Sequence, residues 1–124
     1  MRRRVLIVED ERLLGEALCE LISTDHDAEL ATTVAVALAR LRTDPDIEVI
    51  LCDVLLPDGS AADVYREYSA HWPGRERRIV FVTGGVEDPG LQQLLDSGRN
   101  RVLKKPFDLN VLPSLIEAVA CAST

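Results

Sequence analysis

The sequence predicts an α/β fold in which helices cover both faces of one doubly wound, parallel, five-stranded sheet. Three observations predict it. Short apolar runs alternate with helical patterns along the 124 residues, the clearest apolar runs are continuous, and turn-forming residues separate the segments. Continuous apolar strands are typical of parallel sheets buried on both faces, and strands that alternate with helices predict βαβ units. The length suits one domain with its own core and is too short for two.

Five apolar runs are the strand candidates. They lie at residues 4–8 (RVLIV), 28–31 (AELA), 47–52 (IEVILC), 78–82 (RIVFV) and 101–103 (RVL). The second run is a weak candidate, and the fifth is short. A helical pattern follows each run, at residues 11–22, 33–42, 62–72, 89–97 and 109–121. This order is (βα)5, with crossover connections that are right-handed.

Proline and glycine predict several helix boundaries. Pro73 and Gly74 stop the third helix. Around the fourth helix, Asp88 is the expected N-cap, Pro89 the first helical residue and Gly98 the residue past the end, an arrangement that suits the backbone requirements of these positions.

Composition excludes several classes of protein. The net charge of −7 repels phosphates, which argues against direct binding of DNA or RNA. No apolar run approaches the roughly 20 residues that span a membrane, and no signal segment precedes the first strand. The cysteines, Cys19, Cys52 and Cys121, lack the spacing of a metal site, and the first two lie in apolar patterns. A reducing cytoplasm fits this pattern best.

Polar residues follow four of the five strand candidates. They are Glu9 and Asp10 after the first, Asp53 after the third, Thr83, Gly84 and Gly85 after the fourth, and Lys104, Lys105 and Pro106 after the fifth. In a flavodoxin-like strand order of 2-1-3-4-5, the first and third strands are neighbours at the point where ligands bind. The carboxylates of Glu9, Asp10 and Asp53 should therefore converge.

Each residue of this group also has an ordinary structural interpretation when taken alone. Asp10 could cap the first helix and Asp53 could open a turn. Taken together, three converging carboxylates repel one another unless a cation neutralises them. An oxygen-only site of this kind suits Mg²⁺, or Mn²⁺ in its place.

The same group of residues predicts phosphoryl transfer to a carboxylate. Mg²⁺ commonly completes its ligand shell with a phosphate oxygen. Thr83 and a lysine would supply a hydroxyl and a positive charge to that phosphate. Asp53 would be the nucleophile and would form an aspartyl phosphate.

At this point the sequence closely resembles a known family, the receiver domain of two-component response regulators. The resemblance covers essentially the whole chain. The matching segments are VLIVEDE, ILCDVLLPDGS, VFVTGG and LKKPF, which occur in the family's order and at its spacing. The resemblance implies a phosphoacceptor signalling domain rather than an enzyme, with a histidine kinase or phosphotransfer domain as its partner.

The resemblance also implies a role for each matching residue. Asp53 accepts the phosphoryl group. Asp10 and Asp53 bind Mg²⁺ directly, Glu9 acts through water, and Leu55 offers its backbone carbonyl.

The remaining matches concern the phosphoryl group. Thr83 bonds it, and Lys105 pairs with the acceptor before it arrives. Lys104 falls on the other side of the strand and is solvated. Gly84 keeps the site open, and the Lys105–Pro106 peptide bond is expected to be cis.

Two positions depart from the family pattern. The family's loop glycine falls at Ala61, where Gly59 can supply the flexibility. The aromatic residue that turns inward in many receivers falls at Val102, so we expect signalling to act through residues 84–98 instead.

The VTGGVEDPG segment is most like receivers of hybrid sensor kinases. We expect residues 1–124 to be a single receiver domain with no output domain after Cys121. Whether it stands alone or was cut from a longer protein is left open, as is a homodimer.

Two other functions are alternatives for this set of residues. A haloacid dehalogenase-like phosphatase also uses an Asp nucleophile and Mg²⁺, but it needs a second Asp where this chain has Leu55. A pseudo-receiver that binds partners without phosphorylation is disfavoured because no site residue is missing.

Overall fold

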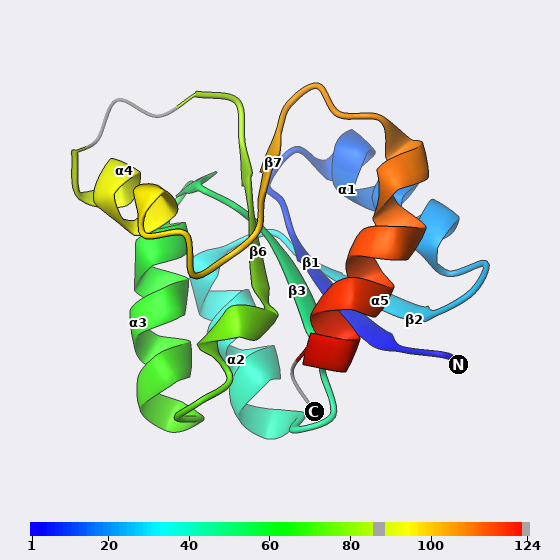
Figure 1. The fold of residues 1–124 in the computed structure, drawn as a ribbon, viewed down its shortest axis with the longest axis horizontal. Helices are drawn as coiled ribbons and strands as arrows, with labels where there is room; N and C mark the ends of the chain where they lie inside the picture. Colours follow the sequence, from blue (N-terminus) through cyan, green and yellow to red (C-terminus); the bar gives the residue numbers. More distant parts are fainter. Residues whose placement is uncertain (86–88, 123–124) are drawn as a thin grey trace.

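A central parallel sheet determines the architecture. The computed structural model describes residues 1–85 and 89–122 (Figure 1). Its five-stranded sheet consists of β1 (Arg4–Val8), β2 (Asp27–Ala31), β3 (Val49–Asp53), β6 (Ile79–Thr83) and β7 (Val102–Lys104). The strand order is β2-β1-β3-β6-β7, and every pairing is parallel. In chain order this is 2-1-3-4-5, so the predicted doubly wound sheet is confirmed.

Helices cover both faces of this sheet (Figure 1). They are α1 (Arg12–Ile22), α2 (Val34–Thr43), α3 (Ala61–His71), α4 (Pro89–Asp96) and α5 (Leu112–Ala122), with short 3-10 helices η1 (Glu76–Arg78) and η2 (Leu109–Val111). One core packs α1 and α5 against the sheet, and the other packs α2 and α3 against the opposite face. Among the described residues, no helix is long and apolar enough to cross a bilayer.

Side chains along each strand point alternately into the two hydrophobic cores. In β3, Ile50 and Cys52 face the core under α2 and α3, while Val49 and Leu51 face the core under α1 and α5. All four side chains are at most 2% exposed. Successive strand side chains point to opposite faces, which is why a strand buried on both sides is continuously apolar.

Most predicted boundaries differ from the observed ones by one or two residues. The predicted helix at 109–121 begins instead as η2, where the Asp108 carboxylate accepts the Asn110 N–H at 2.9 Å, and continues as α5 from Leu112. Pro89 is the first residue of α4, as predicted, and Gly98 has a φ of 71°, the left-handed conformation that suits the end of a helix. The predicted N-cap, Asp88, lies outside the described residues.

A small hairpin follows β3 that the sequence did not predict. It pairs β4 (Leu55–Leu56) with β5 (Gly59–Ser60) in antiparallel register. Asp58 lies in the turn of this hairpin. Its carboxylate accepts hydrogen bonds from the backbone N–H groups of Val34 at 2.7 Å and Ala35 at 3.0 Å. Its carboxylate therefore caps the N-terminus of α2 from a different part of the chain.

The hairpin leads directly into α3. The Ser60 side chain accepts the Ala62 N–H, and the Asp63 carboxylate accepts the Ser60 N–H at 2.9 Å, which forms a capping box. A Cβ at Gly59 would lie 2.5 Å from an Asp63 oxygen. A larger residue at this position would therefore have to displace the Asp63 carboxylate from the capping box. Ala61, at the position of the family's loop glycine, is buried as the first residue of α3.

Candidate functional site

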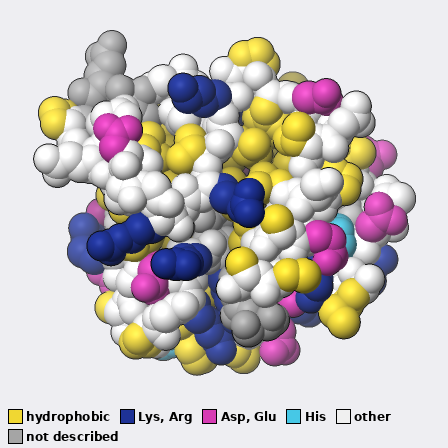
Figure 2. All heavy atoms as spheres, in the orientation of Figure 1, with side chains coloured by type: hydrophobic (Ala, Val, Ile, Leu, Met, Phe, Trp, Pro, Cys, Tyr) yellow, Lys and Arg dark blue, Asp and Glu magenta, His cyan; other side chains and the backbone are white. Residues whose placement is uncertain are grey.

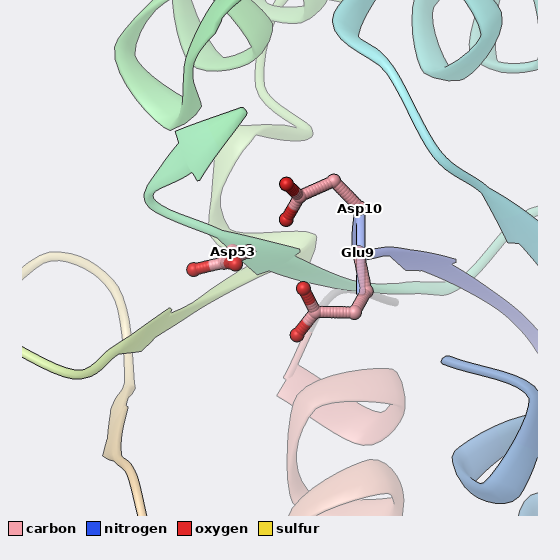
Figure 3. Close-up of side chains that lie close together, drawn as sticks. All are labelled: Glu9, Asp10 and Asp53. Carbon is pink, nitrogen blue, oxygen red and sulfur yellow. The ribbon is translucent and has the colours of Figure 1, made fainter. Parts of the chain in front are cut away.

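Three carboxylates meet at the carboxyl ends of β1 and β3 (Figure 3). The parallel register places Val8 opposite Cys52, so the residues that follow, Glu9 and Asp53, emerge side by side. Together with Asp10 they offer ligand oxygens that all lie within 4.8 Å of one another. Glu9 is buried, Asp53 is half-buried and Asp10 is exposed. The convergence expected from the strand order is therefore present in the structure.

Asp10 does not cap α1. The N-cap residue is Glu11, which makes no side-chain capping bond. Its backbone N–H donates instead to the Glu9 carboxylate at 3.2 Å. Among the described residues, Asp10 has no ion-pair or hydrogen-bond partner, so its carboxylate oxygens are available to a ligand.

Lys105 is the cation of the site. Its ammonium donates to Glu9 at 2.7 Å and lies 3.4 Å from an Asp53 oxygen. The Lys105 N–H donates to the carbonyl of Thr83 at 2.7 Å, and the Lys105–Pro106 peptide bond is cis, as expected. Lys104 is exposed. The structure thus brings Lys105 to the carboxylates, as predicted, but pairs it more closely with Glu9 than with Asp53.

The pKa values reflect the crowding of like charges. Burial, followed by the hydrogen bond and charge of Glu9, raises the pKa of Asp53 to about 6, and Lys105 only partly opposes this effect. Burial also works against the charged form of Glu9, but hydrogen bonds, chiefly from Lys105, hold its pKa below the ordinary value. Partial burial likewise opposes the charge of Lys105, and the two carboxylates outweigh it and raise its pKa. Within this pair, Asp53 is the carboxyl that protonates first as the pH falls.

The donor set fits a hard divalent cation. Three carboxylates face one ammonium among the described residues, which leaves an excess of negative charge. Oxygen ligands without nitrogen or sulfur donors suit Mg²⁺. Leu55 lies two residues after Asp53, in β4, with its side chain 57% exposed. Its backbone carbonyl as a further ligand stays a prediction.

Thr83 ends β6, next to the acceptor strand. Its side chain is buried, and its hydroxyl accepts the Gly85 N–H at 3.0 Å. A Cβ at Gly84 would meet nothing within 4 Å, so this position is open. Beside Thr83 is a cavity of about 400 Å³ with Leu95 and Val102 in its lining. Thr83 and Lys105 both line this cavity, whereas the carboxylates of Glu9, Asp10 and Asp53 are not part of its lining.

Sequence reasoning missed one part of the site region, the Asp58 cap on α2. The signal was present in the Pro57-Asp58-Gly59 turn, because Asp is favoured both in turns and at helix N-termini. What the sequence could not provide was the second element, since the capped helix lies 24 residues earlier in the chain.

The sheet order, with acidic residues after β1 and β3, a threonine after β6 and a lysine after β7, defines a receiver-type α/β domain. The sequence matches the model of the response regulator receiver domain family over residues 5–117. The chain belongs to that family.

Relatives agree with this assignment. The swarming motility regulation protein RssB of Serratia marcescens is 33% identical over 116 residues, which cover 93% of this chain and 52% of RssB. The chain thus spans about half the length of this curated relative.

Solved structures share the fold. A CheY-like receiver domain protein of Methanospirillum hungatei JF-1 is 21% identical, with a TM-score of 0.85 over 99% of this chain and 97% of that one. The receiver domain of the sensor histidine kinase PA1611 of Pseudomonas aeruginosa PAO1 is 23% identical, with a TM-score of 0.77 over 98% and 99%. That structure has a magnesium ion coordinated in its active site cleft.

Proposed function

We propose that Asp53 accepts a phosphoryl group from the phosphohistidine of a histidine kinase or phosphotransfer domain, in a Mg²⁺-dependent reaction, and that the domain then changes conformation to signal. The observation that supports this best is the position of Asp53, between two further carboxylates and the Lys105 ammonium at one edge of the sheet. Membership of the receiver family supports the same role.

In the proposed transfer, an Asp53 oxygen attacks phosphorus, the new O–P bond forms, and the P–N bond of the phosphohistidine breaks. The imidazole leaves with the bonding electron pair. Lys105 and the Thr83 hydroxyl donate to phosphoryl oxygens, and the open position at Gly84 admits the group. The reaction needs positioning and charge neutralisation more than acid–base chemistry.

Mg²⁺, or Mn²⁺ in its place, would be held by Asp10, Asp53 and the Leu55 carbonyl, with Glu9 acting through water. When bound, the ion supplies charge neutralisation to the phosphoryl oxygens. The oxygen-only donor set supports this proposal, and so does the magnesium ion in the PA1611 receiver domain.

An apolar surface beside the site supports a protein partner. Leu13 is 81% exposed on α1, and Leu109 is 48% exposed after β7. Between these elements lies a cavity of about 510 Å³, with Leu14, Pro106 and Phe107 in its lining. Apolar contacts around a charged acceptor suit a helical phosphodonor, since they hold the donor histidine in position without competing for the phosphoryl group.

We further propose that residues 1–124 form one receiver domain, which is a signalling module and not an enzyme with turnover of its own. We also propose that this domain works in a reducing cytoplasm and does not bind nucleic acid directly. A phosphatase of the dehalogenase type is disfavoured, because the exposed Leu55 stands where that mechanism needs an acid.

Incubation with acetyl phosphate and Mg²⁺ tests the proposal. Mass spectrometry should show one added phosphoryl group on the wild type and on Asp25→Asn, whose exposed side chain lies in the loop after α1 and outside the carboxylate cluster. Asp53→Asn should not be labelled. Equal labelling of Asp53→Asn would overturn the assignment, and labelling that is independent of Mg²⁺ would overturn the role of the metal.

A further inference from the structure

Ion pairs are distributed unevenly over this acidic protein. Every lysine and arginine side chain outside residues 75–104 pairs with a carboxylate. These side chains are Arg2, Arg3, Arg4, Arg12, Arg40, Arg42, Arg66 and Lys105. Within residues 75–104, no basic side chain forms an ion pair with a described carboxylate. The chain has 21 acidic residues, so carboxylates are abundant, yet all of the unpaired cations lie in this one region.

Two of the six unpaired cations have structural roles. Arg75 stacks on the Trp72 ring, 4.5 Å from its centroid, and donates to a backbone carbonyl. Arg78 is half-buried and donates to the Ile47 carbonyl at 2.9 Å. The other four are exposed and have no side-chain partner among the described residues: Arg77, Arg99, Arg101 and Lys104. We call these four residues the basic edge.

A buried asparagine links the segments that carry three of these four residues, Arg77, Arg99 and Arg101. Asn100 is 8% exposed, and its side-chain amide donates to the carbonyls of Glu76 and Ile79, both at 2.8 Å. It fixes the chain between Arg99 and Arg101 against η1, which carries Arg77. Figure 2 shows dark blue side chains at the top, the centre and the lower left of this face, with a magenta one among those at the lower left, while most magenta side chains lie to the right.

Two acidic residues close in sequence, Glu76 and Asp96, form no ion pair with the basic edge. The Glu76 carboxylate accepts the Gly74 N–H at 3.0 Å, and the Asp96 carboxylate accepts the Gln92 amide at 2.8 Å. Both are turned toward neutral donors. The basic edge is therefore a local positive surface on a protein of net charge −7.

The basic edge also borders an open strand. β7 is the last strand of the sheet and, in the part of the chain that the structure describes, pairs with β6 alone. The Arg101 carbonyl and the Lys105 N–H form hydrogen bonds with β6. Because neighbouring strand residues direct their backbone groups to opposite sides, the N–H and carbonyl of Lys104 point away from β6, toward the open edge. Charged side chains commonly protect such an edge from pairing with other strands. That role accounts for Lys104, but Arg77 and Arg99 lie outside the strand.

We propose that the basic edge is a binding surface for a carboxylate-rich segment of a protein partner, separate from the phosphoacceptor site. Guanidinium groups form paired hydrogen bonds with carboxylates, and three of the four cations are arginines. A long nucleic acid would be repelled by the net negative charge of the whole domain. A short acidic segment, by contrast, would contact mainly the local positive surface. This inference is independent of phosphorylation at Asp53.

Fluorescence anisotropy with a labelled peptide of alternating Glu and Ser residues tests the proposal on the full chain at low ionic strength. The edge variant replaces the four residues of the basic edge with Gln. The control variant replaces Arg2, Arg12, Arg42 and Arg66 with Gln; these side chains are exposed and ion-paired, and the change in net charge is the same. The edge variant should bind the peptide about tenfold more weakly than the wild type, since several exposed pairs are lost, and the control should bind like the wild type. Thermal unfolding checks that both variants fold.

Four results would overturn the proposal. One is the absence of peptide binding by the wild type. Another is an equal loss of binding in the two variants, because that would make the effect one of net charge alone. Tighter binding of a duplex DNA of equal charge would assign the basic edge to nucleic acid. Self-association of the wild type in sedimentation, lost in the edge variant, would assign it to a second copy of the chain.

Discussion

The ammonium group of Lys105 lies 2.7 Å from a Glu9 oxygen, closer than the 3.4 Å that separates it from Asp53. Glu9 is almost fully buried, so without this contact its charge would be costly. The stronger bond leaves the acceptor, Asp53, less completely neutralised. The electrostatics of the metal-free site therefore favour both a divalent cation and a proton on Asp53.

Mg²⁺ should stabilise the fold. A ligand that binds only the folded protein raises the free energy of unfolding, by about 1.4 kcal/mol at roughly ten times its Kd. Asp10→Asn should weaken this stabilisation and raise the metal-free melting temperature, because it removes a like charge from the cluster. Asp25→Asn, a change in the loop after α1 and outside the cluster, is the control. A melting temperature indifferent to Mg²⁺ in the wild type would contradict the metal site.

The metal-free protein should lose stability as the pH rises from about 4.5 to about 6. The pKa of Asp53 is raised from an ordinary 3.8 to about 6, so in this window the folded state holds a proton that the unfolded chain has released. The free energy of unfolding then falls with increasing pH. Glu9 has a lowered pKa and the opposite effect, which appears mainly below its ordinary value of 4.5.

Urea unfolding at pH values across this window measures the effect. Asp53→Asn should flatten the slope, because the variant has no carboxyl to titrate at that position. Saturating Mg²⁺ should flatten it as well, since the ion competes with the proton. An unchanged slope in Asp53→Asn would assign the titration to another group.

The sequence predicted what depends on periodicity and strand order. Continuous apolar strands and alternating helices were enough for the sheet, and the sheet order alone brought Glu9, Asp10 and Asp53 together. It did not predict the β4–β5 hairpin, because two-residue strands are too short to show a pattern. The sequence also did not predict that the Lys105 ammonium lies closer to Glu9, at 2.7 Å, than to Asp53, at 3.4 Å, because this difference depends on how the side chains pack.

The conformational response to phosphorylation should concentrate around α4. The β7 residue where many receivers carry an aromatic is Val102, which has little rotamer freedom. The Thr83 hydroxyl accepts a hydrogen bond from the Gly85 N–H at 3.0 Å, which connects it to the segment that leads to α4. Movement of Thr83 toward a phosphoryl group would break that bond. Hydrogen exchange with a beryllofluoride mimic should change at residues 84–85 and 89–98. A change confined to residues 101–103 would show the expectation to be wrong.

Asp58 should matter for the acceptor site as well as for stability. Its carboxylate binds the first two N–H groups of α2, and the hairpin that carries it begins two residues after Asp53. The cap thus fixes the segment that contains Leu55, whose carbonyl is a predicted Mg²⁺ ligand. Helix caps contribute about 1 kcal/mol, and a ligand held in place by the fold loses less entropy on binding.

A matched pair of variants separates these two roles. Thr33 caps the same helix through its hydroxyl, which accepts the Val36 N–H at 3.1 Å, but Thr33 is not part of the hairpin. Thr33→Val and Asp58→Ala should therefore both lower the free energy of unfolding by about 1 kcal/mol. Only Asp58→Ala should also weaken Mg²⁺ binding in calorimetry and slow labelling by acetyl phosphate, while Asp58→Asn, which keeps one acceptor oxygen, should recover part of both. If the two caps affected Mg²⁺ affinity equally, Asp58 would be a helix cap and nothing more.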